Sequence, residues 1–121
     1  MVKLFIVQGD TGIVQIALTN PDCTPIDLTN YDITFTIKRS HFDTDADALW
    51  QGTLANNDIT IIGSNADGLI QVVIPHDNTV LMRQGKPYYW DVQLEDAANK
   101  ISTPSFGLIY ASMEVTQSVA S

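Results

Sequence analysis

Hydrophobic and polar residues alternate along most of this chain, with the period of two that is typical of β-strands buried on one face. The clearest example is YDITFTIKR, residues 31–39, in which Ile33, Phe35 and Ile37 share one face and polar side chains occupy the other. Comparable alternation occurs at 13–19, 69–75, 88–95 and 107–116, and weaker strand patterns occur at 3–8, 48–54 and 58–62. These segments predict an all-β protein.

Turn-forming residues separate these segments. The turns are QGDTG (8–12), NPDCTP (20–25), GSNADG (63–68) and EDAANK (95–100). Strands that recur about every 10 to 15 residues between such turns are typical of an antiparallel sandwich. We therefore expect a single domain over residues 1–121, folded as an antiparallel β-sandwich of about seven to nine strands.

One segment departs from the alternation. PHDNTVLMRQG, residues 75–85, predicts a short helical turn near 77–84 that crosses between two strands. We expect Asp77 or Asn78 to cap this turn and Gly85 to end it. Leu81 is expected to pack beneath the sandwich.

Three consecutive aromatic residues occur in KPYYWDVQLED, residues 86–96. The alternation continues through them, so Tyr88 and Trp90 fall on the face shared by Val92 and Leu94. We therefore expect Trp90 to be a core residue, since large aromatic side chains contribute most when they are buried. Tyr89 points the other way and is a candidate contact residue. The later segment 107–116 is less clearly one-sided, because its second face also carries apolar residues, Leu108 and Tyr110.

Composition and charge narrow the classes of function. The chain has 14 acidic and 6 basic residues and a net charge of −8, with no basic cluster. We therefore expect binding neither to nucleic acid nor to an anionic membrane surface, since both require clustered Lys and Arg. No apolar stretch approaches the ~20 residues of a membrane helix. Cys23 is the only cysteine, so no disulfide can form within the chain.

The segment DTDAD carries three alternating carboxylates, Asp43, Asp45 and Asp47. This spacing is similar to the first half of a calcium-binding loop. The second half does not match, because Ala48 stands where the loop needs glycine and Leu54 stands where it needs glutamate. We interpret the segment as a solvated acidic loop and expect no metal there. A weak calcium site completed by another loop is the alternative.

The remaining candidate residues do not form a catalytic group. His41 and His76 lack neighbours at metal-ligand spacing, and Cys23 has no adjacent Lys, Arg or His in the sequence. We expect a protein that is not an enzyme and that carries no cofactor. Trp50, next to the acidic segment, is either a core residue of an edge strand or, together with Tyr89, part of a carbohydrate-binding surface.

Five segments in this order carry a family resemblance: FIVQGDTGIVQIAL (5–18), PIDLTNYDITFTIKR (25–39), GLIQVVI (68–74), YYWDVQLED (88–96) and STPSFGLIYASMEVT (102–116). They resemble the immunoglobulin-like β-sandwich domains of tailed-phage virion proteins found in baseplates, tail fibres and related components. The matching motifs are Gly9-Asp10-Thr11, Ile26-Asp27-Leu28-Thr29, Tyr89-Trp90-Asp91, Gly107 and Val115-Thr116.

The resemblance implies an immunoglobulin-like fold and a structural role in a virion assembled in the host cytoplasm. It implies an assembly or docking module of the tail or baseplate, and a capsid decoration (cement) protein is the alternative. The expected partners are other virion structural proteins and further copies of the same chain, arranged as a trimer or a ring. From a different class, a carbohydrate-binding module that uses Trp50 and Tyr89 remains open.

Overall fold

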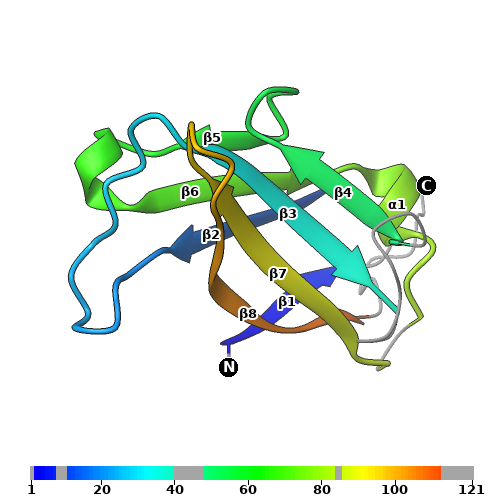
Figure 1. The fold of residues 1–121 in the computed structure, drawn as a ribbon. Coiled ribbons are helices and arrows are strands. Elements are labelled where there is room, and N and C mark those ends of the chain that lie inside the picture. The colour runs from blue at the N-terminus through cyan, green and yellow to red at the C-terminus, as the bar shows by residue number, and fades with distance from the viewer. Residues whose placement is uncertain (1, 8–10, 40–47, 84–85, 113–121) are drawn as a thin grey trace.

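The computed structural model describes residues 2–7, 11–39, 48–83 and 86–112, and its strands form two sheets packed face to face. The five-stranded sheet has the order β1 (Val2–Val7), β8 (Ile101–Ser112), β7 (Tyr88–Glu95), β3 (Asp32–Lys38) and β4 (Trp50–Thr53). The three-stranded sheet has the order β2 (Gly12–Ala17), β6 (Leu69–Ile74) and β5 (Ile59–Ile61). Figure 1 shows the five-stranded sheet in front of the three-stranded one. The expected all-β sandwich is confirmed.

The alternation in the sequence becomes alternation in burial. Buried and less buried residues follow one another along all of β7, whose bounds are those expected, and along β2 and β6. In β3, Ile33, Phe35 and Ile37 are buried as expected. Thr36 lies on the opposite face of β3 and is nevertheless only 2% exposed. The amide Nε2 of Gln51 on β4 donates a hydrogen bond to its hydroxyl at 3.1 Å.

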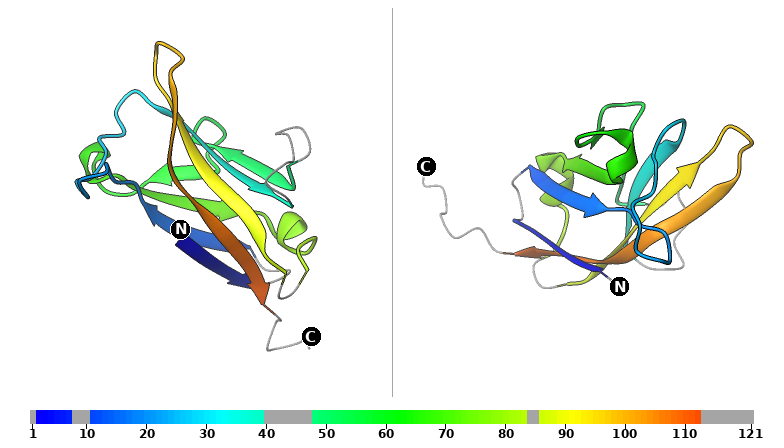
Figure 2. Two further views of the ribbon diagram at one scale, coloured as in Figure 1. Left: turned by 60° about the horizontal axis from the view of Figure 1, so that its bottom comes forward. Right: turned by 90° about the vertical axis from the view of Figure 1, so that its left-hand side faces the viewer.

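The first and last strands correct the expectation of a wholly antiparallel sandwich. β1 pairs with β8 in parallel, with Leu4 opposite Ile109 and Phe5 opposite Tyr110. Figure 2 shows these two strands side by side and running in the same direction. β1 does not form a hairpin with β2, because β2 belongs to the other sheet. A hairpin requires antiparallel neighbours, whereas strands from opposite ends of the chain can pair in either direction.

Strand β8 begins six residues before the expected segment 107–116 and pairs with β7 through a hairpin. Asp96 closes the hairpin turn, since its Oδ1 accepts hydrogen bonds from the backbone N–H groups of Ala98 and Lys100, each at 2.9 Å. The register then shifts between Val92 and Leu94, where β8 carries Pro104. A bulge accommodates proline, which has no N–H to donate to the ladder.

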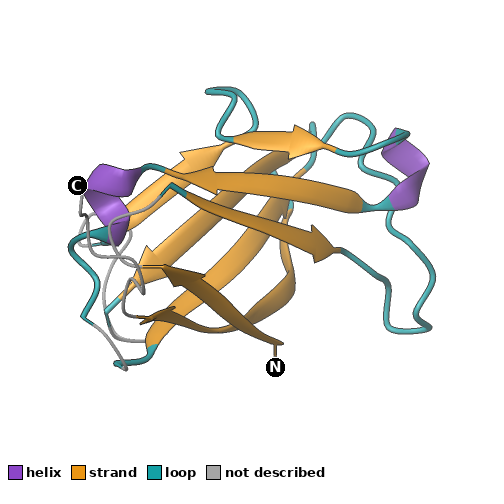
Figure 3. Cartoon of the chain, turned by 180° about the vertical axis from the view of Figure 1, so that it is seen from behind, coloured by secondary structure: helices purple, strands orange, loops and turns teal. Residues whose placement is uncertain are grey.

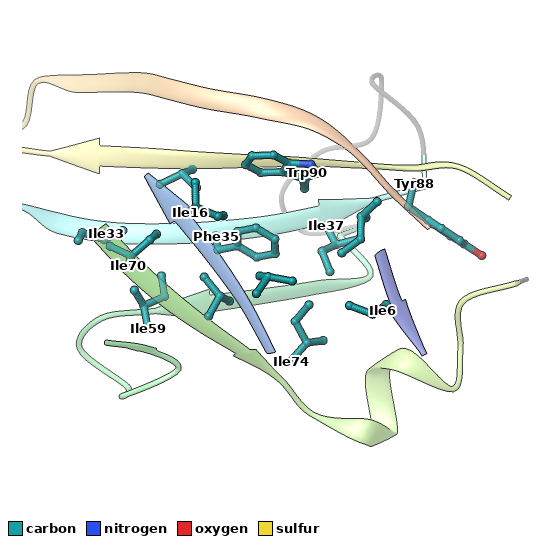
Figure 4. Packing of buried hydrophobic residues seen from close by; sticks show 14 of the residues in the cluster. Ile6, Ile16, Ile33, Phe35, Ile37, Ile59, Ile70, Ile74, Tyr88 and Trp90 are labelled. Carbon is teal, nitrogen blue, oxygen red and sulfur yellow. The ribbon is translucent and has the colours of Figure 1, made fainter. Parts of the chain in front are cut away.

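The core lies between the sheets and is made of aliphatic side chains around two stacked aromatic rings. Trp90 is 2% exposed and stacks on Phe35, with ring centroids 5.7 Å apart and an interplanar angle of 20°. Figure 4 shows the two rings together among the isoleucines of both sheets. The indole Nε1 of Trp90 donates a hydrogen bond to the Leu108 carbonyl at 3.1 Å. Trp90 is therefore a core residue, as expected.

The helical turn is present, but its details differ from the expectation. Helix α1 spans His76–Thr79, and Pro75 is its N-cap residue instead of Asp77 or Asn78. Met82 is fully buried after the helix, whereas Leu81 is 56% exposed, so the expectation that Leu81 packs beneath the sandwich is wrong. Gly85 lies outside the described residues.

A second short helix, the 3-10 turn Asn65–Asp67, lies at the opposite end of the sandwich from α1 (Figure 3). It ends at Gly68, which has a φ of +65°. A Cβ at Gly68 would lie 2.6 Å from the Leu18 carbonyl oxygen, so both the backbone conformation and the close contact require glycine.

Candidate functional site

The outer face of the five-stranded sheet carries a group of large apolar side chains. The pairing register determines this face, because directly opposed residues in neighbouring strands point to the same side of a sheet. Tyr89 on β7 is opposite Leu108 on β8, and Tyr110 on β8 is opposite Phe5 on β1. We call this group the aromatic face. It consists of Phe5, Tyr89, Phe106, Leu108 and Tyr110.

The aromatic face is accessible and partly ordered by its own contacts. Phe5 is 67% exposed and Phe106 is 56% exposed, whereas Tyr89, Leu108 and Tyr110 are half-buried. The rings of Phe5 and Tyr110 stack with centroids 5.6 Å apart and an interplanar angle of 16°. Such stacking fixes the orientation of the two rings relative to one another, so they form one apolar unit on the outer face.

Polar groups surround one part of the aromatic face. A hollow of about 370 Å³ opens beside Tyr89 and Phe106. Its lining residues come from β3, β7 and β8: Thr36, Lys38, Tyr89, Trp90, Asp91, Thr103, Phe106 and Gly107. The hollow thus combines the outer-face rings of Tyr89 and Phe106 with hydroxyl groups and with one side chain of each charge.

The other end of the same outer face is acidic. Asp32 on β3 is directly opposite Glu95 on β7, and Asp96 follows at the hairpin turn. Thr34 and Gln93 form the next opposed pair along these strands. Like charges opposite one another destabilise a sheet, so they are expected only where water can solvate them. The outer face therefore changes from acidic and solvated at the hairpin end to apolar at the aromatic face.

Trp50 lies on the inner side of the sheet, away from Tyr89. It is opposite Ile37, which is also opposite Trp90, so Trp50 and Trp90 point to the same side. Its side chain is half-buried, and its ring centroid lies 6.1 Å from that of Phe35. The indole also covers Gly52, since a Cβ added to this glycine would lie 2.4 Å from the indole ring. Trp50 therefore packs against the core at the edge of the sheet. The structure does not bring Trp50 and Tyr89 together.

The connection from β2 to β3 forms a second, more open hollow. This hollow, of about 550 Å³, lies between that connection and the start of β8, and Cys23 is among its lining residues. Cys23 is exposed and has a φ of 70°. Two turns of the form Asp-x-Thr order the connection. Asp22 Oδ1 accepts hydrogen bonds from the hydroxyl and backbone N–H of Thr24, and Asp27 Oδ1 accepts the same pair from Thr29.

These hydrogen bonds have an electrostatic consequence. Hydroxyl donation from Thr24 and Thr29, followed by donation from their backbone N–H groups, lowers the pKa of Asp22 and of Asp27 below the usual value. Both carboxylates are used within their own turns. The connection is thus a structural element, and neither aspartate is directed at a shared ligand.

Within the part of the chain that the structure describes, no three His, Cys, Asp or Glu side chains gather as metal ligands would. Asp43, Asp45, Asp47 and His41 lie outside the described residues. His76 lies on α1, where its Nδ1 is 3.3 Å from Oδ1 of Asp77, and both side chains are largely exposed. Among the helices described, none is long and apolar enough to span a membrane.

The sequence identifies Tyr89 as a candidate contact residue, but it does not show that Phe5, Phe106, Leu108 and Tyr110 share a face with it. The sequence signal for this face is the segment FGLIYA, residues 106–111, which has apolar residues on both of its faces instead of on one. A strand within a two-layer sandwich needs only one apolar face, so a second one indicates a further contact.

In comparisons with known proteins, no family model matches this chain, and no curated protein matches it.

Proposed function

We propose that this chain is an immunoglobulin-like, non-enzymatic assembly module of a tailed-phage virion. The strand order supports the immunoglobulin-like topology. β2, β6 and β5 take the places of strands B, E and D, and β3, β4, β7 and β8 take those of C, C′, F and G. The parallel pairing of β1 with β8 adds a strand beside G.

A local feature supports the same topology. Immunoglobulin-like domains have a tyrosine near the start of strand F whose hydroxyl bonds to backbone a few residues upstream. Tyr88 begins β7, is 2% exposed, and its hydroxyl accepts a hydrogen bond from the Arg83 N–H at 2.7 Å. Two residues later, Trp90 occupies the position on strand F at which many such domains carry one cysteine of their inter-sheet disulfide, and it packs on Phe35 of β3.

The aromatic face is the observation that supports docking. It is partly exposed and made of large apolar side chains, four of them aromatic, which is typical of surfaces that bind another macromolecule. Fold alone does not determine function, so the virion assignment depends on the sequence resemblance.

We assign the module to the tail or baseplate, and we keep capsid decoration as the alternative position within the same class. The proposed partners are other virion structural proteins and further copies of the chain, arranged as a trimer or ring. Repetition around a symmetric particle favours one small domain with a closed set of contacts.

Cryo-electron microscopy of intact particles tests this proposal. We expect density for the two-sheet sandwich at repeated positions in the tail or baseplate. Density on the capsid surface would move the assignment to decoration. If the chain is absent from purified virions by mass spectrometry, the proposal is wrong.

Carbohydrate binding is a second candidate, and the hollow beside Tyr89 favours it. Two aromatic rings flanked by hydroxyl and charged groups can stack on a sugar and bind its hydroxyls. Trp50 is not part of this candidate site, because it points to the opposite side of the sheet. Glycan-array binding that Tyr89→Ala abolishes, in a protein that remains folded, would favour this function over docking.

A further inference from the structure

We propose that the aromatic face binds the aromatic face of a second copy of the same chain, so that two five-stranded sheets pack outer face to outer face. This inference rests on the proposed docking function and adds the surface and the partner. The contact is isologous, which means that the same residues of both copies meet across a two-fold axis. It is separate from a trimer or ring formed through sheet edges.

The shape of the surface favours a copy of itself as the occupant. Sheets pack face to face when their twists match, at a separation of about 10 Å. A second copy has the same twist, so its sheet fits without any change of backbone. The rings of Phe5 and Tyr110 stack with an interplanar angle of 16°, so a second copy meets two rings whose mutual orientation is already fixed.

The exposed apolar area of the aromatic face has the size expected for the central part of a protein interface. A phenylalanine side chain buries roughly 150–250 Å², so Phe5 and Phe106, at 67% and 56% exposure, each leave on the order of 100 Å² uncovered. With the half-buried members, the aromatic face reaches a few hundred Å², roughly the size of the largest apolar patches on monomers. A standard contact needs about 800 Å² per partner, and the polar residues around the face supply the remainder.

The distribution of charge on the five-stranded sheet also favours this end of its outer face. Each copy carries a net charge of −8, so two copies repel one another in most orientations. The hollow at the aromatic face is lined by one cation and one anion, Lys38 and Asp91. The acidic pair Asp32–Glu95 lies at the other end of the sheet. A self-contact through the aromatic face therefore keeps the excess negative charge away from the interface.

Sedimentation velocity of the full chain over a concentration series tests the proposal. We expect a reversible species of twice the 13.3 kDa mass of one chain. Raising NaCl from about 0.05 M to about 0.5 M should tighten the association, because salt screens the repulsion between acidic copies while apolar contact persists. Phe5→Ser combined with Phe106→Ser should weaken it by at least about tenfold, as loss of central aromatic residues does.

The matched control combines Ile13→Ser with Leu81→Ser. These residues are 60% and 56% exposed and lie elsewhere on the surface, so the control removes a comparable number of exposed apolar side chains. We expect it to leave the dimerisation constant unchanged. Thermal unfolding of both double variants verifies that they fold.

Three outcomes overturn the self-contact: a monomer at all concentrations, a dimer that the aromatic variant leaves intact, or a monomer whose Tyr89 binds glycan. If the protein stays monomeric but is located in virions, the self-contact is wrong and the proposed function stands. If it dimerises as expected but is absent from virions, the self-contact stands and the virion function is wrong.

Discussion

The two faces of the five-stranded sheet use aromatic residues for opposite purposes, and strand β7 contributes to both. On the inner face, Trp90 is buried, stacks on Phe35 and donates its N–H to the Leu108 carbonyl. On the outer face, the neighbouring residue Tyr89 is only half-buried and borders a hollow. The contrast shows that one run of three aromatics is both core and surface. Substitutions on the inner face should therefore affect folding, and those on the outer face should affect association.

The largest effect is expected for Trp90→Ala. This change empties a site at the centre of the sandwich and leaves the Leu108 carbonyl without its indole donor. Large-to-small aromatic substitutions in a core cost about 3–5 kcal/mol, so we expect a loss of that size in the free energy of unfolding. Urea denaturation measures it.

Tyr89→Ala on the same strand is the control for Trp90→Ala. Its side chain is on the outer face, so we expect a loss of about 1 kcal/mol or less, in the range of substitutions near a surface. Equal losses for Tyr89→Ala and Trp90→Ala would contradict the assignment of the two faces.

The second largest loss of stability is expected for a substitution on the inner face of the five-stranded sheet, at its edge strand β4. Gly52 on β4 lies beneath Trp50, and a Cβ there would come within 2.4 Å of the indole and 2.9 Å of the Asp58 Cβ. Gly52→Ala should therefore cost about 1–3 kcal/mol, as overpacking does. The cost should fall in a Trp50→Ala background, because the closest contact is then absent. A double-mutant cycle by urea denaturation measures this coupling, and strictly additive costs would mean that Trp50 does not cover Gly52.

How far the sequence determined the fold differs between elements. The burial of β7 follows from its sequence residue by residue, because its alternation is strict and its bounds are marked by Pro87 and by the turn at Asp96. The parallel pairing of β1 with β8 could not be predicted, since it joins the two ends of the chain and no local pattern encodes it. The early start of β8 was missed because Pro104 argues against a strand unless a bulge is known.

The candidate site was predicted only in part, for a similar reason. Tyr89 could be identified from its own strand, because alternation places its side chain on the other face of the strand from that of Trp90. The aromatic face also needs Phe5, which lies next to Tyr110 only after the ends of the chain have paired. Trp50 was grouped with Tyr89 as a sugar-binding candidate, but the register places their side chains on opposite sides of the sheet. The grouping of residues that are far apart in the sequence therefore became visible only in the structure.

A third, smaller effect is expected on the outer face. Phe5→Ala removes the ring stacked on Tyr110 but opens no cavity, because Phe5 is 67% exposed. We expect a loss of about 0.5–1.5 kcal/mol in the free energy of unfolding, the usual contribution of an aromatic pair. Thermal unfolding of dilute protein measures this loss apart from association. A loss as large as that of Trp90→Ala would mean that Phe5 belongs to the core.

The smallest effect lies outside both faces, in the connection from β2 to β3. Hydrogen bonds from Thr29 lower the folded-state pKa of Asp27, so the stabilisation is fully present above the unfolded-state pKa of about 3.9. It is lost as the pH falls through the lower, folded-state pKa. Asp27→Asn retains the accepting Oδ1 and removes the titration. The variant should therefore lose less in melting temperature than the wild type between pH 5 and about pH 2.

Asp27→Ala distinguishes the charge of this residue from its hydrogen bonds. It removes both, so it should lower the melting temperature at neutral pH as well, whereas the asparagine variant should retain most of its stability there. Thermal unfolding by circular dichroism at several pH values measures both variants. If Asp27→Asn and the wild type lose stability in parallel on acidification, the turn at Asp27 does not contribute to acid sensitivity. The dependence on pH must then come from other carboxylates, such as Asp22, whose pKa is lowered by hydrogen bonds from the hydroxyl and the backbone N–H of Thr24.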